Sequence, residues 1–309
     1  MLQFKNISKS YGENRALNDI HFNVNEGELF GLIGPDGAGK STLFRILTTV
    51  LLPDSGNILF DGYDVVDDYK YVRKNVGYMP GKFSLYKDLS VKENLEFFAT
   101  IFNTSIEENY DLIKDIYHQL KPFEDRKAGA LSGGMKQKLA LSCALIHKPK
   151  VLVLDEPTFG VDAVSRKEFW DMLKILKTKG VTIIVSTPYM DEASLCDRVA
   201  LIQKGKILEI DTPNGIISSF KKILYKIESK EIYKSLNILS EFPETSDSYS
   251  FGQEIHIYSE KELDTNTIER KLIEAGIKDA KISIGKANIE DCFMDLMLSH
   301  NLLENGAIG

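Results

Sequence analysis

A glycine-rich segment constrains the fold of this chain more than any other feature. It reads Gly34, Pro35, Asp36, Gly37, Ala38, Gly39, Lys40, Ser41, Thr42. The apolar run Leu29–Ile33 before it predicts a buried strand, and the pattern after it predicts a helix from about Lys40 to Val50. A GxxxxGK[ST] segment between a strand and a helix is typical of a loop whose backbone N–H groups surround a polyphosphate. The sequence therefore predicts an α/β domain that binds a nucleotide.

Four side chains have expected roles in this nucleotide site. Lys40 is expected to reach the β- and γ-phosphates, and the Ser41 hydroxyl to ligate Mg²⁺. A second apolar strand, Val151–Leu154, ends in Asp155 and Glu156. Because such a strand delivers carboxylates to its C-terminal end, Asp155 is expected to hold Mg²⁺ and Glu156 to polarise an attacking water.

A third motif precedes a helix predicted at about Met135–Ile146. It consists of Leu131, Ser132, Gly133, Gly134, Met135. Ser132 is suited to cap the helix, and the glycines leave backbone N–H groups exposed. Taken alone, this short motif indicates no more than a helix cap.

The pattern of elements predicts two domains. Residues 1–218 alternate β-rich runs with helical patterns, and residues 82–148 form a mostly helical insertion. Residues 219–309 predict the order βαββαβ of a small ferredoxin-like α+β domain. A last helix is expected at about Ile289–Leu298, with Asn301–Gly309 frayed.

Composition excludes several classes of protein. The 309 residues carry a net charge of −7, which argues against a protein that coats nucleic acid. No apolar run approaches the roughly 18 residues of a membrane span, and the first residues do not resemble a signal peptide. These observations predict a cytoplasmic protein. Its cysteines are expected to be buried, reduced thiols: Cys143, Cys196, Cys292.

The ordered set GPDGAGKST, LSGGM and VLVLDEP resembles the ATP-binding cassette of ABC transporters, over about Leu2 to Pro213. The resemblance implies a P-loop NTPase fold with an inserted helical subdomain. It also implies that two cassettes pair head to tail, so that Ser132 of one chain touches the γ-phosphate bound by the other. By the same resemblance, Tyr11 stacks on adenine, and Asp162 belongs to a loop that crosses the dimer interface.

Further segments resemble the ATPase subunits of drug and antibiotic exporters. These are GYMPGKFSLYKDLSVKENL, LSGGMKQKLALSCAL and ANIEDCFMDLM. The resemblance implies separate integral membrane permease subunits and a peripheral position on the cytoplasmic face of the membrane. Phe83, Leu85 and Tyr86 would line the groove for a permease helix, or else would pack under the helical insertion. The small C-terminal domain is expected to serve dimerisation or regulation.

Two positions depart from the family pattern. Gly81 stands where the family has a glutamine that contacts Mg²⁺ and the attacking water, and Pro188 stands where it has a histidine that contacts the γ-phosphate. Since neither residue offers a polar side chain, we expect this site to bind ATP and Mg²⁺ but to hydrolyse ATP slowly. We therefore expect a heterodimer with a competent cassette, with a slow homodimer that relies on Glu156 as the alternative.

Two other functions agree less well with the sequence. A soluble, non-transport ABC ATPase usually carries two cassettes or a long coiled coil, neither of which this sequence shows. A P-loop kinase needs arginines over the transferred phosphate, and the LSGGM segment disfavours it.

Overall fold

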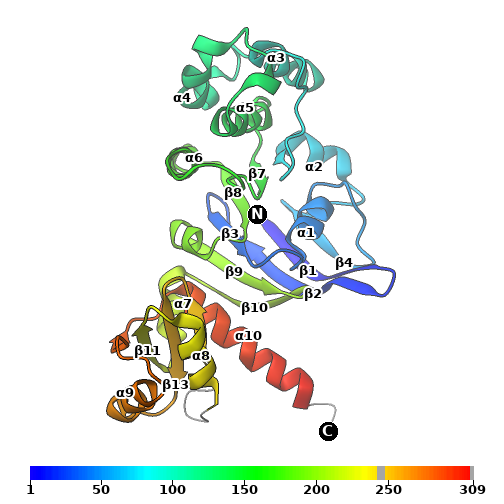
Figure 1. Cartoon of the computed structure of the whole chain (residues 1–309). Coiled ribbons are helices and arrows are strands. Elements are labelled where there is room, and N and C mark those ends of the chain that lie inside the picture. The colour runs from blue at the N-terminus through cyan, green and yellow to red at the C-terminus, as the bar shows by residue number, and fades with distance from the viewer. Residues whose placement is uncertain (242–247, 307–309) are drawn as a thin grey trace. The chain divides into compact units, whose positions relative to one another are not determined.

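The computed structural model describes residues 1–241 and 248–306. The chain divides into two compact units, Met1–Pro213 and Asn214–Gly309 (Figure 1). The first unit contains two sheets and the second contains one, and each unit has its own hydrophobic core.

A six-stranded sheet forms the centre of the first unit, with the order β10-β9-β3-β8-β7-β6. Five strands run parallel and β10 pairs antiparallel with β9 at the edge. The strands are β3 (Leu29–Ile33), β6 (Val76–Met79), β7 (Val151–Asp155), β8 (Thr182–Thr187), β9 (Arg198–Gln203) and β10 (Lys206–Asp211). Every residue of β3, β7 and β8 is buried, as expected for strands covered on both faces.

A second, antiparallel sheet has the order β2-β1-β4-β5. Its strands are β1 (Leu2–Tyr11), β2 (Asn14–Val24), β4 (Ser55–Phe60) and β5 (Tyr63–Asp64). Buried and exposed residues alternate along much of β1 and β2. The sequence pattern did not predict this sheet. Its β1–β2 and β4–β5 pairs are local hairpins, whereas the β1–β4 pairing joins segments far apart in the chain.

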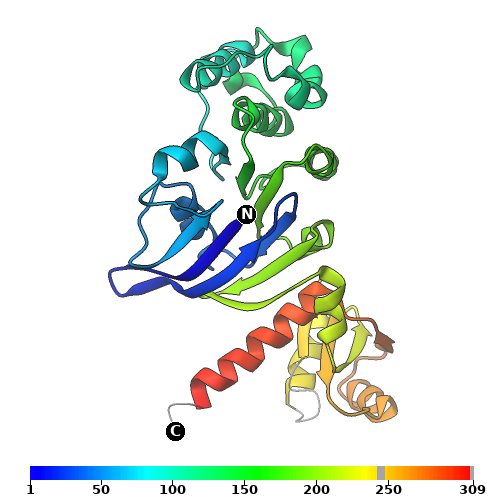
Figure 2. The same ribbon diagram turned by 180° about the vertical axis from the view of Figure 1, so that it is seen from behind.

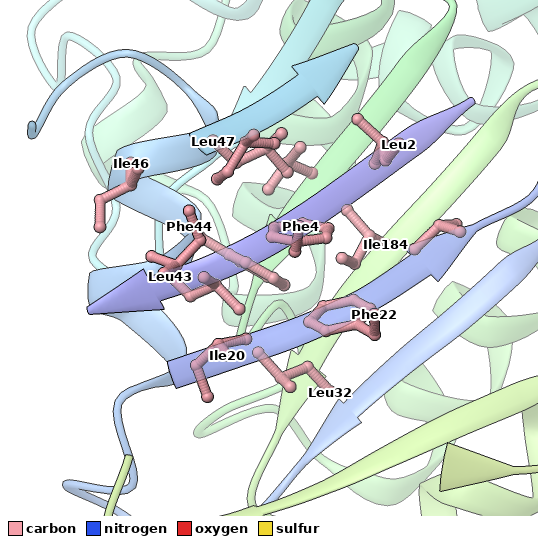
Figure 3. Close-up of a cluster of buried hydrophobic side chains, with 14 of the residues drawn as sticks. Leu2, Phe4, Ile20, Phe22, Leu32, Leu43, Phe44, Ile46, Leu47 and Ile184 are labelled. Carbon is pink, nitrogen blue, oxygen red and sulfur yellow. The ribbon is translucent and has the colours of Figure 1, made fainter. Parts of the chain in front are cut away.

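The helix that follows the phosphate loop, α1 (Lys40–Leu47), packs in the core shared by the two sheets (Figure 3). Its Phe44 is fully buried, and the rings of Phe4 and Phe22 stack with centroids 4.1 Å apart. Ile184 of β8 belongs to the same cluster. This packing fixes the start of α1, and with it the phosphate loop, relative to the central sheet.

Three helices make up the insertion: α3 (Val91–Ile101), α4 (Tyr110–Leu120) and α5 (Gly133–Leu145). Figure 1 and Figure 2 show them grouped at one end of the first unit, beyond α2 (Tyr69–Asn75) and α6 (Ala163–Thr178). A capping box begins α3, since Ser90 and Glu93 each accept the other's backbone N–H. An ion pair of 2.7 Å from Lys138 to Glu168 joins α5 to α6.

The second unit has the predicted order βαββαβ, and its sheet order is β12-β13-β11-β14, the arrangement of a ferredoxin-like domain. After α7 (Pro213–Ser219), its elements are β11 (Ile223–Glu228), α8 (Ile232–Ser240), β12 (Ser248–Phe251), β13 (Glu254–Ser259), α9 (Thr265–Glu274) and β14 (Lys281–Gly285). All three strand pairs are antiparallel. One core lies between this sheet and its helices.

A buried polar cluster joins the start of α10 (Ile289–Gly306) to β13. His256 Nδ1 lies 2.6 Å from Asp291 Oδ1, and the Tyr258 hydroxyl donates to the same oxygen over 3.1 Å. Burial alone would raise the pKa of Asp291, but the hydrogen bond with His256 and the Asn288 N–H outweigh it and hold that pKa below its usual range. The pair thus fixes where α10 begins.

Two predictions on the chain's ends and cysteines have clear outcomes. The predicted end of the last helix near Leu298 was wrong: α10 continues to Gly306, because no glycine or proline interrupts it earlier. Residues 307–309 of the expected frayed segment lie outside the described residues. All three cysteines are buried, and none forms a disulfide bond in the described part of the chain. Within the described ranges, no helix combines the length and apolarity that a membrane span requires.

Candidate nucleotide-binding site

Two glycines determine the path of the phosphate loop between β3 and α1. A Cβ atom at Gly34 would lie 2.1 Å from the carbonyl oxygen of Ile202 in β9, and one at Gly39 would lie 2.4 Å from that of Ala16 in β2. Gly39 also has a φ of +107°, which L side chains rarely adopt. The loop therefore lies closer to its neighbours than any residue with a side chain allows.

Lys40 lies inside this loop, with 3% of its surface exposed. Its ammonium group donates to the carbonyl oxygens of Gly34, at 2.8 Å, and Pro35, at 3.0 Å. It also forms an ion pair of 3.1 Å with Glu156. Three acceptors match the three N–H donors of a lysine, so the positive charge is held at the centre of the loop.

Ser41 and Asp155 meet at the base of the loop, as the sequence predicted for a Mg²⁺ site. The Ser41 hydroxyl donates to Asp155 Oδ1 over 3.1 Å. The Ser186 hydroxyl donates to the same oxygen over 2.7 Å. Mg²⁺ prefers oxygen ligands and takes one or two from the protein beside phosphate and water. The Ser41 and Asp155 oxygens fit that requirement.

Glu156 directly follows β7 and takes a φ of 49°, a left-handed conformation that non-glycine residues rarely adopt. Its backbone N–H donates to both the carbonyl and the hydroxyl oxygen of Ser186, each over 3.1 Å. Its side chain is 22% exposed. Ser186 therefore holds both acidic residues, a role that the sequence analysis missed. The signal was available, since Ser186 ends the apolar run that the structure places beside β7.

A cavity of about 510 Å³ brings most of the predicted nucleotide residues together. It is lined by Tyr11, Gly37, Lys40, Ser41 and Glu156 among others, with Arg15 and Lys204 as further basic residues. Tyr11 is 47% exposed, at the end of β1. The cavity falls within the usual volume range of ligand sites, about 300–1,000 Å³.

The LSGGM segment lies away from the lining of that cavity. Ser132 caps α5 as predicted, accepting the Met135 N–H over 3.3 Å. A Cβ atom at Gly134 would lie 2.6 Å from Ser165 Oγ, so the start of α5 packs closely on the start of α6. Asp162 caps α6, and the N–H of Ser165 lowers the pKa of its carboxyl group. The structure therefore brings the LSGGM segment and Asp162 together.

The two departing positions border the cation site and the end of β8. A Cβ atom at Gly81 would lie 3.1 Å from the carbonyl oxygen of Asp155 and 3.9 Å from its carboxyl carbon. Pro188 follows Thr187, the last residue of β8, whose carbonyl oxygen accepts the Gly34 N–H over 3.3 Å. Position 81 therefore faces Asp155, and position 188 directly follows a residue bonded to the phosphate loop.

A second, mostly apolar cavity of about 360 Å³ lies between α2, β6 and the helical insertion. Of the three residues predicted for a groove, Leu85 lines this cavity. Tyr86 is half exposed and packs edge-on against Phe97, while Phe83 lies under the ammonium group of Lys136.

Two titratable side chains of this cavity have shifted pKa values. Burial lowers the pKa of His147 to about 4. Burial and the charge of Asp155 raise the pKa of Tyr78 to about 12. Both groups are therefore neutral at pH 7.

The chain is similar to known proteins in sequence and in structure. The family described as ABC transporter matches residues 17–159. The chain is 40% identical over 218 residues to the probable multidrug ABC transporter ATP-binding protein YbhF of Escherichia coli. That match covers 70% of this chain and 38% of the relative, so the chain spans well under half the relative's length.

Other matches extend over more of the compared protein. The Nod factor export ATP-binding protein I of Burkholderia lata is 38% identical over 221 residues, which cover 71% of this chain and 73% of that protein. A solved dimeric bacterial ABC transporter cassette is similar with a TM-score of 0.62 and 27% identity, covering 69% of this chain and 98% of that one. The chain belongs to the ATP-binding proteins of the ABC transporter family.

Proposed function

We propose that this chain is the ATP-binding and ATP-hydrolysing subunit of a membrane exporter. One observation carries the proposal: the Ser41 and Asp155 oxygens lie 3.1 Å apart beside the buried Lys40 ammonium group, at a cavity of nucleotide size. The names of the relatives, which are multidrug and Nod factor export proteins, support export as the direction of transport.

The residues divide the work on the nucleotide. The backbone from Gly34 to Thr42 and the Lys40 ammonium group bind the phosphates, and Tyr11 stacks on adenine. Ser41 and Asp155 would hold Mg²⁺, which would supply positive charge beside the phosphates. Glu156 accepts a hydrogen bond from the attacking water and orients it.

The second half of each site comes from another cassette. Ser132 and the exposed N–H groups of the LSGGM segment close over the phosphates bound by a partner, and Asp162 lies in the loop at that interface. Because Gly81 and Pro188 carry no polar side chain, this chain's own site turns over slowly while its LSGGM segment completes a fast site. The partner is therefore a different, competent cassette.

The permease subunit contacts the apolar cavity of about 360 Å³, which Leu85 and Phe98 help to line. Apolar pockets of this kind bind the apolar face of a helix. The chain is then a peripheral protein at the cytoplasmic face of the membrane, held there by its permease.

The test mixes this chain with candidate partner cassettes and measures ATPase activity. Ser132→Arg is expected to abolish the activity of the pair, whereas Glu156→Gln in the same chain is expected to cost little. Glu26→Gln, at an exposed position, is the matched control for loss of a carboxylate. If Glu156→Gln removes nearly all turnover, the slow-site proposal fails and the homodimer replaces it.

A further inference from the structure

Glu192 is a buried carboxyl group that the proposed reaction does not use. It lies in the 3-10 segment Met190–Leu195 and is 1% exposed. Its Oε1 accepts the hydroxyl of Thr158 over 2.8 Å, and its Oε2 accepts the hydroxyl of Thr187 over 2.5 Å. Arg166 of α6 lies 3.7 Å from Oε1. Both carboxyl oxygens therefore bond to threonines from different segments.

The segment that contains Thr187 is bonded to the phosphate loop. Thr187 ends β8, and its carbonyl oxygen accepts the N–H of Gly34, the first residue of the phosphate loop. Its hydroxyl oxygen also accepts the N–H of Tyr189 over 3.0 Å. Since Pro188 has neither an N–H nor a polar side chain, the geometry of this turn depends on Thr187 and on its bond to Glu192.

The second segment leads to the surface that faces a partner cassette. Thr158 follows Glu156 by two residues, and its carbonyl oxygen accepts the N–H of Val161 over 3.2 Å, one residue before Asp162. The same loop reaches the LSGGM segment, because a Cβ atom at Gly133 would lie 3.9 Å from the carbonyl oxygen of Gly160. Movement of Thr158 therefore affects the loop that contacts the LSGGM segment.

We propose that Glu192 is a positioning residue that fixes the turn at 187–189 relative to the loop at 158–162. It thereby couples the nucleotide site of this chain to the surface that completes the partner's site. The inference rests on the proposed function, and it assigns Glu192 to turnover rather than to nucleotide binding, because Glu192 does not line the nucleotide cavity.

The experiment compares two substitutions of Thr158 in the full chain, mixed with its partner cassette. Thr158→Val removes the hydroxyl and keeps the shape, whereas Thr158→Ser keeps the hydroxyl. Loss of one hydrogen bond to a buried carboxyl group is expected to lower kcat about five- to tenfold with Thr158→Val. Thr158→Ser is expected to retain most of the wild-type kcat. The Kd for MgATP is expected to stay within about twofold, since no residue of the nucleotide cavity changes.

Three further variants test whether both threonines act through Glu192. Thr187→Val is expected to lower kcat as well, and the double variant with Thr158→Val to fall short of the product of the two effects, because both act through Glu192. Thr178→Val removes an exposed hydroxyl that bonds only its own helix and is expected to change nothing. Unchanged kcat with Thr158→Val overturns the inference, and so does failure of Thr158→Ser to retain most of the wild-type kcat.

The wild-type chain separates this result from failure of the proposed function. If the wild type binds no MgATP and adds no ATPase activity to any partner, the proposed function fails. If the wild type binds MgATP and supports turnover, but the Thr158 variants change Kd in step with kcat, only the role of Glu192 is overturned.

Discussion

The two sides of the nucleotide site are built in different ways. On the phosphate-loop side, two glycines, a buried lysine and a serine converge, and most of their contacts are to backbone atoms. The second side in this comparison consists of Gly81, beside Asp155, and Pro188, directly after Thr187, and neither of them lines the cavity. One side is dense in donors, and at these two positions the other offers no polar side chain.

This difference separates binding from hydrolysis. Backbone N–H groups and a buried ammonium group attract a polyphosphate whatever its state of reaction. Acceleration of hydrolysis requires donors aimed at charge that develops in the transition state, and one such donor can contribute roughly 10²–10³ in rate. A site that has the phosphate-binding groups but lacks some of the donors that accelerate hydrolysis is therefore expected to bind ATP and to cleave it slowly.

The largest effect is expected from a substitution in the phosphate loop. Lys40→Met removes the charge at the centre of the loop and is expected to weaken MgATP binding by about 100-fold or more. Isothermal titration calorimetry measures the change. Lys70→Met, at an exposed position in α2, is the control. Unchanged affinity for MgATP in Lys40→Met would contradict the assignment of the loop.

The next largest effect is expected from restoring polar side chains at positions 81 and 188. Gly81→Gln combined with Pro188→His is expected to raise ATP hydrolysis by the isolated chain about tenfold or more. The glutamine would contact the attacking water, and the histidine would supply a donor to the γ-phosphate. Steady-state phosphate release is the measurement. The controls are Gly81→Ala and Pro188→Ala, which change the backbone and crowding near Asp155 without adding a donor. Equal gains in the controls would show that backbone shape, rather than the absent donors, limits the rate.

A smaller effect is expected at Ser186, which bonds both Asp155 and Glu156. Ser186→Ala removes the hydroxyl that donates to Asp155 and accepts the Glu156 N–H. The concentration of Mg²⁺ needed for half-maximal ATP binding is expected to rise about three- to tenfold, because Asp155 loses one orienting hydrogen bond. Ser194→Ala is the exposed control. A change in ATP affinity without a change in Mg²⁺ dependence would argue against this role.

The smallest effect is expected at His147, which lines the apolar cavity and not the nucleotide cavity. Burial lowers its pKa in the folded chain to about 4 from the ordinary 6.5, so unfolding takes up a proton between those pH values. The free energy of unfolding is therefore expected to fall as pH drops from about 6.5 to about 4. The slope of this fall against pH corresponds to the uptake of at most one proton on unfolding. His147→Gln should flatten that part of the curve, as urea titrations at several pH values would show. An unchanged slope would assign the acid sensitivity to other groups.

The comparison of the two sides also explains which parts of the site the sequence predicted. Leu29–Ile33 was predicted as a strand with the bounds that the structure shows, and Ser132 as a helix cap. These features depend on neighbours along the chain. The roles of Ser186 and Glu192 were missed because their bonds to Asp155 and Thr158 join segments far apart in the sequence. The antiparallel sheet was also missed, although only its β1–β4 pairing is long-range.

The sequence by itself determined the phosphate loop, because glycine spacing, a lysine and a hydroxyl set local backbone shape and charge within nine consecutive residues. Only the tertiary structure decided that Asp155 lies within hydrogen-bonding distance of Ser41, that Gly81 borders Asp155, and that Glu192 joins Thr158 to Thr187. The physical reason is that strand pairing and core packing set these distances, and both depend on how the whole first unit excludes water from its apolar side chains.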